Sequence, residues 1–139
     1  MEELFELLKT LYLIRFYSKD IHYNAKGSDF WGDHLLADKV FDGLDGFIDA
    51  INETLYLGYE HTAPYSKDVL RAVYDDLPPI STDISLMWSN LYRLLEYCLG
   101  VIEKIKAEYE MPALSSLLDG ISQDIQAKRG LVWRRKLSI

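Results

Sequence analysis

The chain has 139 residues, of which 49% are hydrophobic, and its formal net charge is −7 at pH 7. This length and apolar content suit one domain with a substantial core, so we expect residues 1–139 to fold as a single unit. The acidic balance argues against nonspecific nucleic-acid binding by the chain as a whole, because phosphate binding needs a positive field, and it favours attraction of cations.

The single cysteine, Cys98, excludes an internal disulfide framework and is typical of a protein from a reducing compartment. The first ten residues, MEELFELLKT, are acidic and amphipathic, unlike a secretory signal. No apolar run reaches the roughly 20 residues that a membrane-spanning helix needs. We therefore expect a soluble, cytoplasmic protein with no membrane partner.

The first helix is predicted over residues 2–25. Its apolar residues recur at steps of three or four, which indicates one buried face. They are Leu4, Leu7, Leu8, Leu11, Ile14, Tyr17 and Ile21. His22 lies just after this series, and a lone histidine there would ordinarily be a capping or core residue.

Gly27 and Ser28 end that helix, and Ser28 or Asp29 can cap a second one that runs to about Leu57, before Gly58. Its apolar residues predict the side that faces the bundle. They are Leu35, Leu36, Val40, Phe41, Leu44, Phe47, Ile48, Ile51 and Leu55.

One histidine and four carboxylates also recur along the second helix at steps of three, four or seven, which keeps them on one stripe. They are His34, Asp38, Asp45, Asp49 and Glu53. A solvated acidic face is the ordinary interpretation of such a stripe. His34, one turn before Asp38, favours a metal site instead.

The spacing of the stripe predicts a shared site. Asp38 and Asp49 are roughly 16 Å apart along a helix, too far to ligate one ion. His34 with Glu53, and Asp38 with Asp49, are both centred between Gly43 and Leu44. Two antiparallel copies related by a two-fold axis at this point would bring the pairs together, and Gly43 and Gly46 would allow close approach. We therefore predict two identical sites at a dimer interface.

Residues 59–82 form a long connection with Pro64, Pro78 and Pro79, and residues 67–77 can form a short helix within it. Such a connection can cross from one end of a four-helix bundle to the other. We interpret His61, on this connection, as a surface residue.

The third helix is predicted over residues 83–109, with Thr82 or Asp83 as its cap, and Cys98 lies on its apolar face as a buried, inert thiol. The fourth helix starts at Met111-Pro112. Neither helix carries the Glu-x-x-His pair of an internal diiron site, which again favours the dimer interface.

The basic end of the fourth helix holds Lys128, Arg129, Arg134, Arg135 and Lys136 with no acid after Asp124. Cations are favoured near a helix C-terminus, which is sufficient to explain them. The alternative is a small basic patch that contacts DNA when several copies of the chain present it together.

The segment from Ile21 to Gly58 resembles the core motif of the Dps family, the ferritin-like DNA-protection proteins of bacteria. The matching residues occur in order and without a gap. They are His22-Tyr23-Asn24, Lys26-Gly27, Phe30, His34, Asp38, Asp49, Glu53 and Leu57-Gly58. Tyr23 replaces the usual Trp, and Asn52 replaces a usual small apolar residue.

This resemblance implies an all-α, ferritin-like four-helix bundle with a short extra helix between helices two and three. It also implies a ferroxidase centre made of His22, His34 and Asp38 from one subunit and Asp49 and Glu53 from its partner. Two-fold dimers would assemble into a hollow dodecamer that stores Fe(III) mineral. The chain has no long basic N-terminal tail, which argues against DNA binding.

Two imidazoles and three carboxylates suit Fe(II), with Zn or Mn as possible substitutes. We therefore expect a ferroxidase that oxidises Fe(II) with hydrogen peroxide or oxygen. Two alternatives stay open: a non-enzymatic Dps-like shell or DNA-compacting protein, and a four-helix diiron protein that is dimeric or assembled differently.

Overall fold

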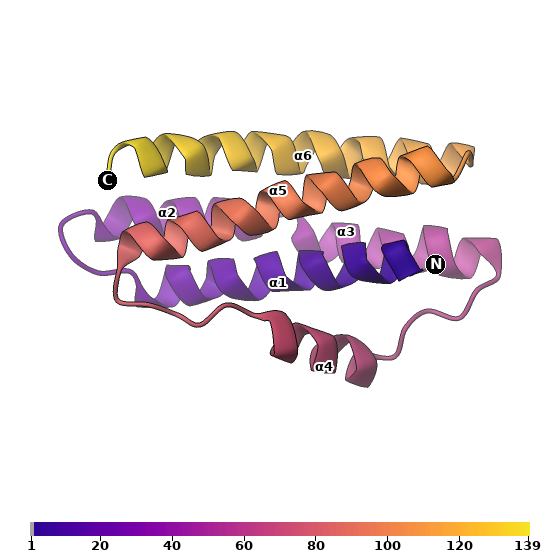
Figure 1. Cartoon of the computed structure of the whole chain (residues 1–139), viewed down its shortest axis with the longest axis horizontal. Helices are drawn as coiled ribbons and strands as arrows, with labels where there is room; N and C mark the ends of the chain where they lie inside the picture. Colours follow the sequence, from indigo (N-terminus) through magenta and orange to yellow (C-terminus); the bar gives the residue numbers. More distant parts are fainter. Residues whose placement is uncertain (1) are drawn as a thin grey trace.

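The computed structural model describes residues 2–139, which form four long helical segments packed side by side and a short helix on the outer side of the first segment (Figure 1). The elements in chain order are α1 (Glu2–Asn24), α2 (Phe30–Phe41), α3 (Leu44–Ala50), a π-helix (Ile51–Tyr56), a 3₁₀ turn (Leu57–Tyr59), α4 (Ser66–Asp76), α5 (Ile84–Glu108) and α6 (Pro112–Leu137). None of the helices in this described part is long and apolar enough to cross a membrane.

The chain direction of each helix follows from Figure 1. α1 is antiparallel to the α2–α3 segment, and α5 is antiparallel to α6. The connection between the two pairs runs the full length of the bundle and carries α4 on the outer side of α1. The predicted crossover and its short helix are therefore confirmed.

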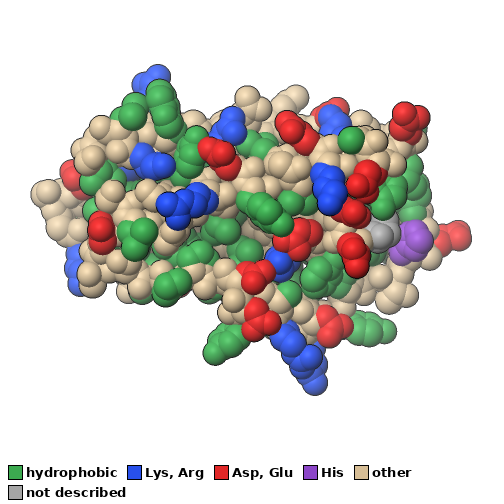
Figure 2. Space-filling model, in the orientation of Figure 1, with side chains coloured by type: hydrophobic (Ala, Val, Ile, Leu, Met, Phe, Trp, Pro, Cys, Tyr) green, Lys and Arg blue, Asp and Glu red, His purple; other side chains and the backbone are tan. Residues whose placement is uncertain are grey.

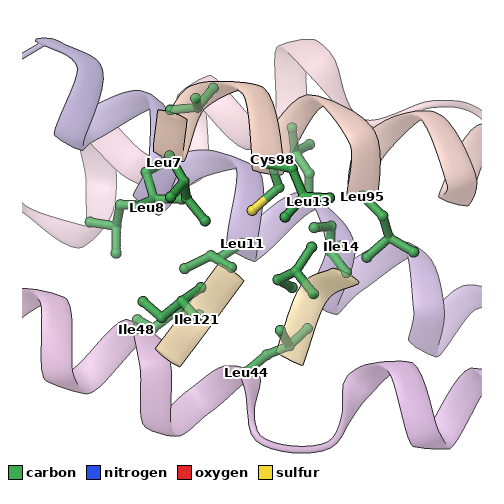
Figure 3. Close-up of a cluster of buried hydrophobic side chains, with 14 of the residues drawn as sticks. Leu7, Leu8, Leu11, Leu13, Ile14, Leu44, Ile48, Leu95, Cys98 and Ile121 are labelled. Carbon is green, nitrogen blue, oxygen red and sulfur yellow. The ribbon is translucent and has the colours of Figure 1, made fainter. Parts of the chain in front are cut away.

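The core is built from the apolar faces predicted for the long helices. Figure 3 shows Leu11 of α1 lying near Leu44 and Ile48 of α3 and Ile121 of α6, all of them buried. Cys98 points into the same cluster from α5. Burial of this apolar surface is the main stabilising term for such a fold.

The predicted ends of the last two helices are confirmed. The Asp83 carboxylate accepts hydrogen bonds from the backbone N–H groups of Ser85 at 3.0 Å and Leu86 at 3.4 Å. These bonds satisfy donors that have no partner inside the helix. Pro112 begins α6, where its missing N–H group is not needed.

The prediction of one unbroken second helix is wrong. Asp42 adopts an extended conformation with φ −58° and ψ 131°, and Gly43 has φ 84°, in the left-handed region that glycine favours. α2 ends here and α3 begins at Leu44. The apolar periodicity continues on both sides of this break, which is why the pattern alone did not reveal it.

Two finer expectations for this segment are also corrected. Leu35 is 50% exposed instead of facing the bundle, because α2 buries the narrow stripe Asp33, Ala37 and Val40. Asp29 stands at the N-cap of α2 but its side chain makes no capping hydrogen bond. Its carboxylate lies 3.4 Å from Nη2 of Arg135.

Candidate metal centre

His22, in the last turn of α1, and His34, in α2, stack against each other. Their ring centroids are 3.7 Å apart and their planes differ by 18°. The bend at Gly27, which has φ 98°, turns the chain back so that α1 and α2 lie side by side. The fold thus brings together two residues that are twelve positions apart in the sequence.

A reciprocal pair of hydrogen bonds fixes both rings. Nδ1 of His22 donates to the backbone carbonyl of His34 at 2.8 Å, and Nδ1 of His34 donates to the carbonyl of His22 at 2.7 Å. A carbonyl oxygen can only accept, so each Nδ1 carries the hydrogen. In the neutral rings, both Nε2 atoms therefore keep a free lone pair, the state in which histidine binds a metal.

Aromatic side chains surround this histidine pair. Trp31 stacks on His34 with 5.6 Å between ring centroids, and Phe30 lies 5.4 Å from the same ring. Tyr23 meets His22 edge-on at 5.2 Å. All three aromatic residues are exposed in the single chain, so they form a partly apolar surface around the imidazoles.

Asp38 lies one turn after His34 and is paired with a cation of its own subunit. Its Oδ1 is 3.5 Å from Nζ of Lys19, and that ammonium also lies 4.0 Å from the centroid of the Phe41 ring. Both charged side chains are partly exposed. A metal ion that approaches Asp38 therefore competes with the Lys19 ammonium for the carboxylate.

Asp49 and Glu53 project into solvent from the other side of the break. Asp49 is in α3 and Glu53 is in the π-helix, and both are exposed. π-Helical turns occur frequently at functional sites. Neither carboxylate makes a side-chain hydrogen bond or ion pair with another residue between 2 and 139.

Asp45, the remaining carboxylate of the predicted stripe, pairs with α1. Its Oδ1 accepts a hydrogen bond from Nε of Arg15 at 2.6 Å. The break at Gly43 ends the regular rotation on which the single stripe depended. The site residues therefore lie in two groups, one on each side of the break.

The chain alone does not assemble these residues into a complete site. Among the described residues, no three His, Cys, Asp or Glu side chains are grouped so that they could hold a metal ion. His22 and His34 are brought together, whereas Asp38, Asp49 and Glu53 do not join them.

The sequence analysis missed a buried ion pair beside the histidines. Asp33 is 1% exposed, and its carboxylate accepts hydrogen bonds from Nε of Arg135 at 2.6 Å and Nη2 at 3.2 Å. The indole Nε1 of Trp88 donates to the same carboxylate at 3.1 Å. The hydrogen bond to Asp33 raises the pKa of the Arg135 guanidinium. The sequence contains one indication that Asp33 is buried: it precedes Ala37 by four residues and Val40 by seven, which places all three on one face of the helix.

The basic run at the end of α6 is smaller on the surface than the sequence suggested. Arg135 turns inward to Asp33, and Lys128 is 3% exposed, with its ammonium 2.8 Å from Asp124. Arg129, Arg134 and Lys136 are left for an outward-facing patch, and Lys136 lies 4.2 Å from the centroid of the Tyr92 ring. The alternative of a DNA-contacting patch thus loses two of its five cations.

His61 and Cys98 are placed as predicted. His61 is exposed beyond the 3₁₀ turn, away from the histidine pair in the sequence and in the fold. Cys98 is buried, and burial raises the pKa of its thiol to about 12. A thiol in this environment is held in its unreactive, protonated form.

Of the three comparisons with known proteins, the one with solved structures identifies the architecture. No family model and no curated protein matches the sequence. Among solved structures, the chain is similar to the crystal structure of Dps92 from Deinococcus radiodurans, with a TM-score of 0.67 and 17% sequence identity. The alignment covers 96% of this chain and 82% of the other. The chain therefore has a Dps-like, ferritin-like fold.

Proposed function

We propose that this protein is an iron-binding ferroxidase and iron-storage protein whose sites are shared between two copies of the chain. Each site would take His22, His34 and Asp38 from one subunit and Asp49 and Glu53 from its partner. Fe(II) is the substrate, and Zn or Mn could occupy the same ligands.

The observation that carries this proposal is the histidine pair. Both Nδ1 atoms are bound to backbone carbonyls, so both Nε2 atoms are held ready to bind a metal. A structural histidine pair inside a core would need partners for all its ring nitrogens. Here the free nitrogens are accompanied by exposed carboxylates on a Dps-like fold.

The charge distribution also supports a cation as the substrate. Asp49 and Glu53 have no cationic partner among residues 2–139, and the chain has a net charge of −7. Carboxylate oxygens are hard anionic ligands that stabilise Fe(III) over Fe(II), which favours oxidation at the site. Each Fe(II) ion gives up one electron, and a peroxide molecule takes up two electrons and two protons to form water. Oxygen is the alternative oxidant.

The storage step of the proposal requires a closed assembly. We propose that two-fold dimers build a hollow homo-oligomer, a dodecamer, in which the ferric product mineralises. The single reduced cysteine is in keeping with a cytoplasmic location, where such a protein would remove iron and peroxide together.

Stopped-flow measurement of Fe(II) oxidation tests the ferroxidase proposal. His34→Ala removes one Nε2 ligand and is expected to lower the initial rate by about 10-fold or more. His61→Ala is the matched control, because it removes the exposed histidine that lies outside the proposed site. Its rate should equal that of the wild type. Equal rates in wild type and His34→Ala would contradict the proposal.

A further inference from the structure

The helix that carries His34 and Asp38 is separated from the rest of the chain at both ends. Gly27, with φ 98°, precedes α2, and Gly43, with φ 84°, follows it. No continuous helix therefore transmits the position of α1 or α3 to α2. Its place in the bundle depends on side-chain contacts with its neighbours.

The first turns of α2 are fixed by the buried Asp33 carboxylate. Two nitrogens of the Arg135 guanidinium reach its two oxygens at 2.6 and 3.2 Å, and the indole of Trp88 adds a third bond at 3.1 Å. A forked contact of this kind fixes direction as well as distance. Asp33 immediately precedes His34, so any displacement of Asp33 displaces the histidine with it.

Asp42, the first residue after α2, is held by a second buried cation. The Lys128 ammonium donates to the backbone carbonyl of Asp42, at the break itself. It also lies 2.8 Å from the Asp124 carboxylate and 6.0 Å from the centroid of the Phe47 ring. With a side chain only 4% exposed, Lys128 is placed at the break and not on the surface.

Both cations come from the same face of α6. Lys128 and Arg135 are seven residues apart, which is close to two helical turns. α6 runs antiparallel to α2, and Figure 1 shows its C-terminal half above α2. Arg135 therefore meets the start of α2 and Lys128 meets its end.

We propose that Lys128 and Arg135 form a two-point clamp, with Asp33 as its anchor, that positions His34 and Asp38 for metal binding. These are positioning residues, since none of the three touches the metal in the proposed site. This inference rests on the proposed metal site. It adds that the position of α2 in the bundle is determined independently of the carboxylates of α3. If Lys128 and Arg135 had only a structural role, they would stabilise the fold without affecting the affinity of the folded protein for metal.

Co(II) titration of the assembled protein, followed by absorption, separates these two roles. Co(II) serves as a probe that does not turn over with oxygen on the timescale of the assay. The clamp variants are Asp33→Asn, Arg135→Gln and Lys128→Met, and the matched control is Arg134→Gln, one residue away on the exposed side of α6. Thermal unfolding and solution mass are measured for each metal-free variant, so that affinities are compared only between folded, equally assembled proteins.

The proposal predicts that the clamp variants bind Co(II) about 10- to 100-fold more weakly, with an altered absorption spectrum, at temperatures well below their unfolding transitions. Arg134→Gln should bind like the wild type. Arg135→Lys keeps the charge beside Asp33 but loses the fork, so it should fold well and show an intermediate affinity. This variant keeps the test decisive if Arg135→Gln fails to fold.

Two negative results have different meanings. If the wild type binds Co(II) and the folded clamp variants bind it equally well, the clamp is overturned while the metal site stands. If the wild type, the clamp variants and His34→Ala all fail to bind Co(II), then the proposed site and the clamp are both overturned.

Discussion

Histidines 22 and 34 show what a sequence pattern can and cannot predict at the scale of residues. His34 is a candidate ligand because it lies one turn before Asp38, and His22 is one because of the motif shared with the Dps family; the structure stacks their rings at 3.7 Å. Their reciprocal bonds to each other's backbone carbonyls depend on the bend at Gly27, which aligns α1 and α2. Contacts between helices of this kind leave no periodic trace in a sequence.

The inward turn of Arg135 was hidden for a similar reason. A basic run near a helix C-terminus is ordinarily solvated, and local sequence does not specify which of its members meets a buried carboxylate. Asp33 sits at a position where α2 otherwise buries Ala37 and Val40. A buried charge requires a partner, but only the fold identifies that partner as Arg135.

The raised pKa values of Cys98 and Tyr56 predict how the stability of the protein changes at alkaline pH. Burial raises the pKa of the Cys98 thiol from 9.0 to about 12 and that of the Tyr56 hydroxyl from 10.0 to about 12. Well below pH 9 both groups are protonated in the folded and unfolded states, so neither makes the free energy of unfolding depend on pH. Above this pH the unfolded chain loses these protons first, and the free energy of unfolding should fall progressively towards pH 12.

Urea unfolding followed by circular dichroism at about pH 7.5 and about pH 10 checks this prediction. Cys98→Ala should show a smaller drop in the unfolding midpoint than the wild type, because it lacks the first group to ionise. The native thiol should also resist a thiol reagent until the chain unfolds. Reaction of the folded protein at the rate of the unfolded chain would show that Cys98 is not buried.

The helices themselves followed from the sequence to within a residue or two at most ends. The cap at Asp83, Pro112 at the first position of α6 and the short α4 rest on local chemistry that acts within one turn. The break at Asp42–Gly43 could not be predicted from the sequence, because a glycine inside an apolar periodic segment is compatible with a continuous helix. The contact of Lys128 with the Asp42 carbonyl, which satisfies a group left by the break, comes from 86 residues away.

Gly43→Ala tests the break. An added Cβ would meet no atom of its own chain within 4 Å, so within one subunit the effect comes from the left-handed backbone at φ 84° and not from crowding. We expect the substitution to lower the free energy of unfolding by about 1 kcal/mol. Gly120→Ala, inside α6 and also with open space, should instead raise it by about 0.5–1 kcal/mol. Chemical denaturation of both variants gives the two values, and equal stabilisation by both would mean that α2 and α3 form one helix.

At the scale of the whole molecule, the surface of one chain exposes large apolar side chains. Large apolar side chains project from α4 and from the residue before it. They are Tyr74 at 84% exposure, Leu70 and Tyr65, and green side chains protrude there in Figure 2. Aromatic residues also surround the histidine pair formed by α1 and α2. Exposed apolar surface of this extent is typical of interfaces between subunits.

The predicted two-fold contact is centred on the break between α2 and α3. Gly43 and Gly46 are exposed, and a Cβ at either would have open space in the single chain. A second copy could therefore approach the backbone closely at these positions. That contact is what would bring Asp49 and Glu53 of one subunit to the imidazoles of the other.

The central claim is that each site is shared, and complementation between two defective chains tests it most directly. His34→Ala and Glu53→Gln should each lower Fe(II) oxidation when expressed alone. In a mixed dimer, one of the two sites takes His34 from the Glu53→Gln chain and Glu53 from the His34→Ala chain, so it is intact. Co-expressed chains that pair at random should therefore recover about a quarter of the wild-type rate. A co-expressed rate no higher than that of the single variants would show that no site is shared between subunits.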